Sequence, residues 1–346
     1  MNKTHPTKSL SAQSIARLLA HIVLATPLLA TPLLVMPQLA AAQTRASGPW
    51  WPNVEWGPGD QAGASNRITP AKVLQALSLV QRGEIYEVGQ IYENGMPLAG
   101  TRTYGLKLIP AGSASGTNRV VANDEFLAAE VGQVGTQFDG LGHIGRELEM
   151  ADGSIERVFY NGFTASEMNS GSGLQRLGIE HIKPILTRGI LVDVAAYKGV
   201  ERLAPDYEIS LGDVLGALAR QGIAADSIEP GDAVLFRTGF AQLWTEPEAY
   251  GGPHAGIGLE VAAWLVERQV TLTGSDTYAT EISTNPNRSL AAPVHQELMM
   301  KNGIFNIENL TFEALAADEV YEFLFVATPI RFKGATGSPL RPLAIR

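Results

Sequence analysis

The sequence predicts an α/β fold, organised as one catalytic domain that follows an N-terminal export segment. Short apolar runs rich in branched side chains occur at 189–194, 233–236 and 270–274, and such runs are typical of buried strands. Helix-like segments at 211–221 and 259–268 lie between or beside them, with Gly or Pro at their boundaries. Strands that alternate with helices in this way indicate an α/β domain.

The remaining chain features favour a single domain that covers residues 43–346. Thr69 is a typical N-cap residue, and Pro70 at the first helical position predicts a helix from there through Val80. Gly and Pro are spread along the chain, which has no internal repeat, low-complexity tract or charge block. No domain boundary is therefore expected after the export segment.

The first 42 residues have the features of a secretory signal peptide. Basic side chains precede an apolar run at 22–39, which ends in the small residues Ala40-Ala41-Ala42. Prolines interrupt the run, and this favours a cleaved leader over a membrane anchor. We expect cleavage before Gln43 and a mature protein that is periplasmic or secreted, without membrane contact.

The amino-acid composition excludes several kinds of functional site and several classes of binding partner. The chain has no cysteine, which excludes disulfides, thiolate metal ligands and a cysteine nucleophile. Its formal net charge is −9, and it becomes −12 once the three cations of the leader are removed. An acidic chain without basic clusters argues against nucleic acid and anionic membranes as partners. A small-molecule substrate is the partner that we expect.

The segment 133–143, QVGTQFDGLGH, is the first candidate for a functional site. In an extended strand, residues two apart share a face, so Gln133, Gln137 and Asp139 can converge. The glycines that follow allow a tight turn, which would bring His143 back toward the same point. An ordinary strand followed by a glycine turn, with a solvated Asp and His, is the competing interpretation.

A second cluster lies in the segment 293–310, PVHQELMMKNGIFNIENL. His295 begins a short helix-like run that Gly303 ends, and an apolar strand-like piece then delivers Glu308. Imidazole and carboxylate groups at the ends of rigid elements suit a metal site. Taken alone, this cluster is better explained by His295 as a helix cap and Glu308 on a surface loop.

Together the two clusters resemble the cyclase family, which includes kynurenine formamidase and isatin hydrolase. The family motif His-x-Gly-Thr-His-x-Asp-x-x-x-His matches 133–143, except that both leading histidines are glutamines here. The later HxxL segment and Glu-x-Leu resemble the distal metal cluster, and a looser likeness runs from about Gly57 to Leu310. The resemblance implies a swivelling β/β/α fold in a single domain, assembled as a homo-oligomer, either a dimer or a tetramer.

The resemblance also implies roles for individual residues. Asp139, His295 and Glu308 would ligate the metal, and His143 would act as the general base. Gln137 would be a weak ligand or a hydrogen-bonding neighbour, because its amide oxygen is a poorer donor than imidazole. Since two family ligands are replaced, we expect one divalent ion, Mn²⁺ or Zn²⁺, instead of a two-zinc site. The role of Gln133 stays open.

Several other residues are candidates for the substrate pocket, or for structural roles only. His254 lies in a glycine-rich loop, where the family often has a similar turn, and Asp276 ends an apolar run and either orients a ligand or caps a turn. His181 is expected to be structural or exposed. Aromatic side chains that could line an apolar pocket are Phe138, Tyr160, Phe240 and Tyr278.

The predicted function is hydrolysis of a small-molecule amide, cyclic amide, imide or lactone through a metal-activated water. In this scheme the cation lowers the pKa of the water and His143 accepts its proton. A metal-dependent lyase or dehydratase, with the same base removing a carbon-bound proton, is one alternative. A non-catalytic periplasmic binding protein is the other.

Overall fold

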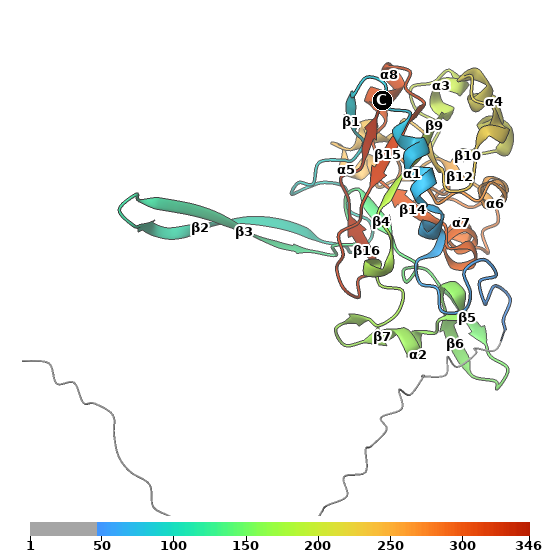
Figure 1. Ribbon diagram of the computed structural model, residues 1–346, viewed down its shortest axis with the longest axis horizontal. Coiled ribbons are helices and arrows are strands. Elements are labelled where there is room, and N and C mark those ends of the chain that lie inside the picture. Colours follow the sequence, from blue (N-terminus) through green and yellow to red (C-terminus); the bar gives the residue numbers. More distant parts are fainter. Residues whose placement is uncertain (1–46) are drawn as a thin grey trace, which may run out of the picture. The chain divides into compact units, whose positions relative to one another are not determined.

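A nine-stranded mixed β-sheet forms the centre of the computed structural model, which describes residues 47–346 (Figure 1). Its strands in spatial order are β1 (Ile85–Glu87), β17 (Leu343–Ile345), β15 (Glu322–Ala327), β9 (Ile185–Asp193), β11 (Ala233–Arg237), β13 (Leu272–Ser275), β14 (Phe305–Glu308), β4 (Gln137–Asp139) and β16 (Gly337–Pro339). β9, β11, β13 and β14 run parallel to one another. The strands on either side of this parallel centre pair antiparallel.

Short strand pairs and helices surround this sheet. The pairs are β2 (Tyr104–Ser115) with β3 (Val120–Ala129), β5 (Arg146–Glu149) with β6 (Ile155–Val158), β7 (Asn169–Ser170) with β8 (Gly173–Leu174), and β10 (Glu208–Ile209) with β12 (Gly256–Ile257). The α-helices are α1 (Pro70–Leu77), α2 (Ala165–Met168), α3 (Val194–Lys198), α4 (Leu211–Arg220), α5 (Pro247–Tyr250), α6 (Leu259–Glu267), α7 (Pro293–His295) and α8 (Glu313–Ala317). The 3₁₀ turns are η1 (Gly63–Arg67), η2 (Tyr160–Gly162), η3 (Ile179–His181), η4 (Ala225–Ser227) and η5 (Phe240–Leu243), and η6 (Gln296–Lys301) is a π-helix.

The elements predicted from apolar runs are present near their expected positions. β9, β11 and β13 are the three predicted strands, and each is almost wholly buried. α4 and α6 lie within the two predicted helical segments. α1 begins as predicted, because the Thr69 side chain accepts a hydrogen bond from the Lys72 amide, but it ends at Leu77, three residues early. The prediction of an α/β domain is confirmed.

A long β-hairpin formed by β2 and β3 was not predicted. Figure 1 shows it extending away from the central sheet. Its strands carry exposed apolar side chains at Leu106, Leu108, Ile109, Val120, Val121, Phe126 and Leu127. Charged residues such as Lys107 and Glu125 interrupt these positions, so neither face has the clean alternation that identifies a half-buried strand in a sequence.

The expected leader at 1–42 lies outside the described residues. Within 47–346, no helix combines the length and apolar character needed to cross a membrane.

Candidate metal centre and adjoining cavity

The pairing register of β4 with β14 places four polar side chains on one face of the sheet. Asp139 lies opposite Asn306, and Gln137 lies opposite Glu308. Because side chains alternate along a strand, these four share a face, while Phe138 between them points to the other face. All four are buried. Two short strands therefore bring two carboxylates and two amides to one point.

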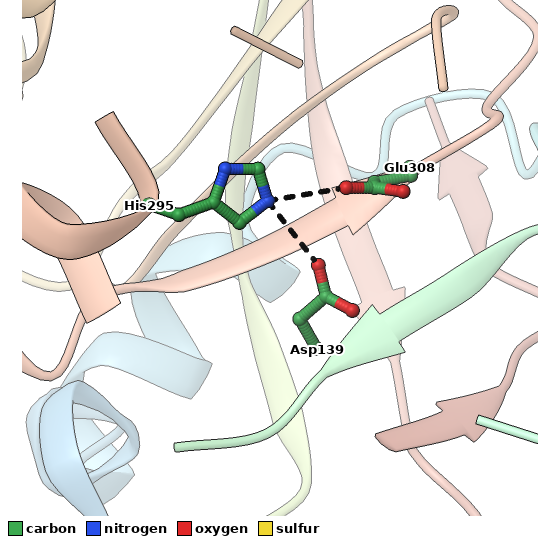
Figure 2. Close-up of side chains that lie close together, drawn as sticks. All are labelled: Asp139, His295 and Glu308. Atoms are coloured by element: carbon green, nitrogen blue, oxygen red, sulfur yellow. Dashed lines mark hydrogen bonds and ion pairs between the residues drawn. The ribbon is translucent and has the colours of Figure 1, made fainter. Parts of the chain in front are cut away.

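His295 reaches the same point from α7. Its Nε2 lies 3.2 Å from Glu308 Oε1 and 3.8 Å from Asp139 Oδ2 (Figure 2). One ligand atom from each residue lies within 4.8 Å of the others, which is close enough for one ion to contact all three. α7 contains only three residues, and the chain continues directly into the π-helix η6. π-Helical turns occur often at functional sites.

Glu281 fixes the orientation of the His295 ring. Its carboxylate accepts hydrogen bonds from the backbone amides of Val294 (3.1 Å) and His295 (3.2 Å), and it contacts His295 Nδ1. When the Nδ1 proton is donated to Glu281, the lone pair of Nε2 faces Asp139 and Glu308. Carboxylate–histidine pairs of this kind orient metal-ligating imidazoles in many proteins.

The buried carboxylates create a negative potential that attracts a cation. Burial, and after it the charge of Asp139, raise the pKa of Glu308 to about 8. Burial acts to lower the pKa of His295, but hydrogen bonds with Glu281 and Glu308 outweigh it and hold this pKa well above 6.5. The same negative potential attracts a proton to His295 and a divalent cation to the site, so the two compete. Metal binding should therefore weaken as the pH falls.

Two side-chain amides complete the surroundings of the three ligand atoms. Asn306 Nδ2 donates to Asp139 Oδ2 and Glu308 Oε1, both at 3.1 Å, and Gln137 Nε2 donates to Glu308 Oε2 at 2.8 Å. The oxygens of both amides are buried without a hydrogen-bond partner. The donor set of carboxylates, imidazole and amide oxygens therefore fits a divalent cation.

A cavity of about 640 Å³ opens beside the three ligands. His143 lines it together with Glu281, His295 and Glu308. Burial lowers the pKa of His143 below 6.5, and the charge of Asp139 opposes this only in part. The His143 imidazole is therefore neutral near pH 7, and it faces the same space as the metal centre.

A second cavity of about 430 Å³ shares several lining residues with the first, including Gln133, His254 and Tyr278. The substrate contacts predicted for His254 and Tyr278 remain predictions, and both side chains line the two cavities. Gln133 Nε2 donates to Asp139 Oδ1 at 3.1 Å, and its Oε1 accepts from Arg102. Gln133 consequently contacts one of the three candidate ligand residues through its amide nitrogen.

Other candidates lie away from the cavity, and one prediction needs correction. Phe138 is fully buried and packs against Phe305, with ring centroids 5.0 Å apart, so it belongs to the core and cannot line the pocket. Asp276 accepts hydrogen bonds from the backbone amides of Thr238 and Gly239, which is the capping role. His181 lies on an exposed turn, as expected.

Sequence reasoning missed three residues of this site: Arg102, Glu281 and Asn306. Asn306 could have been found, because it is two residues before Glu308 in a strand and must share its face. Glu281 and Arg102 carry no local signal. They approach the centre only through loops that the fold brings together.

The first prediction concerns the two carboxylates of the candidate metal centre, Asp139 and Glu308. Asp139→Asn and Glu308→Gln each remove one negative charge with little change in shape, so both should lose stoichiometric divalent metal and activity while remaining folded. Elemental analysis of dialysed protein, with circular dichroism to monitor the fold, measures this. Glu84→Gln, at an exposed position, is the matched control and should keep its metal. Full metal occupancy in both site variants would show that the ligands are misassigned.

The second prediction concerns Gln137, whose side chain bonds to Glu308 and leaves an oxygen unpartnered. Gln137→His replaces a weak amide donor by imidazole, so zinc affinity should increase more than manganese affinity. Competition with a chelating indicator gives both constants. Gln175→His, on an exposed loop, is the control. Unchanged zinc affinity in Gln137→His would mean that this side chain does not face the ion.

Comparison with solved structures supports the fold and the family. A crystal structure described as a novel cyclase is 30% identical to this chain, with a TM-score of 0.73, and the match covers 84% of this chain and 98% of the other. Isatin hydrolase A from Ralstonia solanacearum is 19% identical, with a TM-score of 0.56 and coverage of 81% and 97%. Isatin hydrolase A from Labrenzia aggregata is 18% identical, with a TM-score of 0.55 and coverage of 79% and 97%. At these last two identities, the likeness concerns the fold alone.

No match was found among curated proteins. The family model described as "Putative cyclase" matches residues 58–282, which is more than half of the chain. The resemblance inferred from the two sequence clusters is thereby confirmed, and this chain belongs to the cyclase family.

Proposed function

We propose that this protein is a metal-dependent hydrolase that acts on an amide, cyclic amide, imide or lactone carbonyl of a small molecule. The observation that carries the proposal is the convergence of Asp139, His295 and Glu308 beside a cavity that His143 also lines. Membership of the cyclase family and the fold shared with isatin hydrolases support it. The same proposal includes export, because of the leader expected at 1–42, and assembly into a homo-oligomer.

Asp139, His295 and Glu308 would hold one divalent ion, Mn²⁺ or Zn²⁺, with an amide oxygen as a further weak donor. When bound, such an ion polarises a carbonyl group and lowers the pKa of a water molecule. Glu281 keeps the Nε2 lone pair of His295 directed inward. The buried Asn306 amide holds the two carboxylates together by donating to both.

His143 would accept the proton from the attacking water. It is neutral near pH 7, it faces the cavity, and it is not among the three clustered ligands. A base that is separate from the ligands can change its protonation state during the reaction without releasing the metal. This separation distinguishes the role of His143 from that of His295.

The function is tested with a panel of amides and lactones assayed in water enriched in ¹⁸O. Hydrolysis adds solvent oxygen to the carboxylate product, so mass spectrometry should find the label there. Elimination from a lactone would remove a carbon-bound proton, break the alkyl carbon–oxygen bond of the ring and yield an unlabelled unsaturated acid, which would identify a lyase. Absence of turnover across the panel with metal-loaded protein would contradict the proposal.

The role of His143 is tested separately. His143→Ala should lower turnover about 10²- to 10⁴-fold, the usual contribution of a general base, and should leave the metal content unchanged. In the wild type, kcat/KM should fall as the pH drops through the His143 pKa, and this decrease should lie below pH 6.5 because only the neutral ring accepts a proton. His181→Ala is the control. Loss of metal from His143→Ala would show that His143 is a ligand.

A further inference from the structure

The positively charged guanidinium of Arg102 forms its hydrogen bonds with uncharged side chains. Its Nη1 donates to the Tyr278 hydroxyl at 2.7 Å, and its Nη2 donates to Gln133 Oε1 at 3.1 Å. The guanidinium also lies over the Tyr278 ring, 5.5 Å from its centroid. Within residues 47–346, Arg102 forms no ion pair, whereas the buried Arg188 and Arg237 each pair with a carboxylate. The guanidinium is therefore held in place by uncharged groups, and it acts on the Glu308 carboxylate through its charge without a salt bridge.

The two neutral partners cannot take over the role of a counter-ion. Burial raises the pKa of the Tyr278 hydroxyl, so the phenol remains uncharged. Gln133 is an amide, and its other end is already occupied by Asp139 Oδ1 at 3.1 Å. These contacts use two of the five N–H donors of the guanidinium. They fix its plane and leave donors for a ligand.

Arg102 lines the same 640 Å³ cavity as His143 and Glu308. Arginine is well suited to bind carboxylates, because its planar fork matches the two carboxylate oxygens. Arg288 also lines this cavity, but it is exposed to solvent. The cavity thus combines the candidate metal centre with an oriented arginine that, among residues 47–346, forms no salt bridge.

We propose that the substrate carries a carboxylate group in addition to the reacting carbonyl, and that Arg102 binds this carboxylate. The inference rests on the proposed hydrolase function, because it assigns the substrate class of the same site. Hydrolysis of such a compound produces a second carboxylate. When the substrate is a cyclic amide or a lactone, or carries its carboxylate on the acyl side, both carboxylates remain in one molecule, and the product is a dicarboxylate of which Arg102 would bind one end.

Calorimetric titration of metal-loaded protein tests this with defined probes. Succinate, glutarate and phthalate are compared with butyrate, valerate and benzoate, which lack the second carboxylate. In the wild type, at least one dicarboxylate should bind about 10- to 100-fold more tightly than its counterpart, the range expected for one charge-assisted contact. In Arg102→Gln this ratio should fall to near one. Arg102→Lys, which keeps the charge but loses the fork, should be intermediate.

Arg288→Gln is the matched control, because it removes an equal charge from the same cavity and should keep the ratio. Using the ratio within each variant cancels any change in metal content, which would affect both probes alike. A ratio that persists in Arg102→Gln, or the absence of a dicarboxylate preference in the wild type, would overturn the inference and leave Arg102 as a group that only balances the charge of the metal ligands. Dicarboxylate preference without ¹⁸O incorporation would instead contradict the hydrolase and retain the Arg102 site.

Discussion

The antiparallel register of β4 and β14 is the constraint on which the whole site depends. It places Asp139 opposite Asn306 and Gln137 opposite Glu308, so that four polar side chains face one point while Phe138 enters the core. A shift of β4 by one residue would turn Gln137 and Asp139 away from Asn306 and Glu308 and would bring Phe138 to the polar face. The apolar packing behind the sheet therefore determines the geometry of the polar face. β13 supports this arrangement, since at Gly274 an added Cβ would lie 2.5 Å from the Ile307 carbonyl oxygen and would displace β14.

Charge is the second constraint. Asp139, Glu281 and Glu308 bring three buried carboxylates to a space that contains only one imidazole ligand. Burying unpaired carboxylates costs several kcal/mol each, so the fold requires positive charge nearby. A divalent cation and the guanidinium of Arg102 together carry three positive charges. The arginine thus contributes to the electrostatic balance of the centre even before a substrate enters.

Local sequence patterns predicted the strands and the shared strand face that depend only on residues close together in the chain. Buried parallel strands are continuous apolar runs, so β9, β11 and β13 could be recognised, and alternation placed Gln137 and Asp139 on one face. The same alternation should have assigned Phe138 to the core. Arg102 and Glu281 were missed because their positions result from long-range packing. The hairpin of β2 and β3 was missed because each of its faces carries both apolar and polar side chains. The family motif supplied the link between 133–143 and 293–310 that spacing alone could not.

Asp139 lies far along the chain from the other two candidate ligands, since it precedes His295 by more than one hundred residues. An unfolded chain cannot hold them near one ion, so a cation that binds here binds the native state almost exclusively. Its binding free energy then adds to the free energy of unfolding, by about 2.7 kcal/mol when the free ion is one hundredfold above its dissociation constant. The melting temperature would thus report the free metal concentration, and chelation would loosen the junction of β4, β14 and α7 before other parts of the sheet.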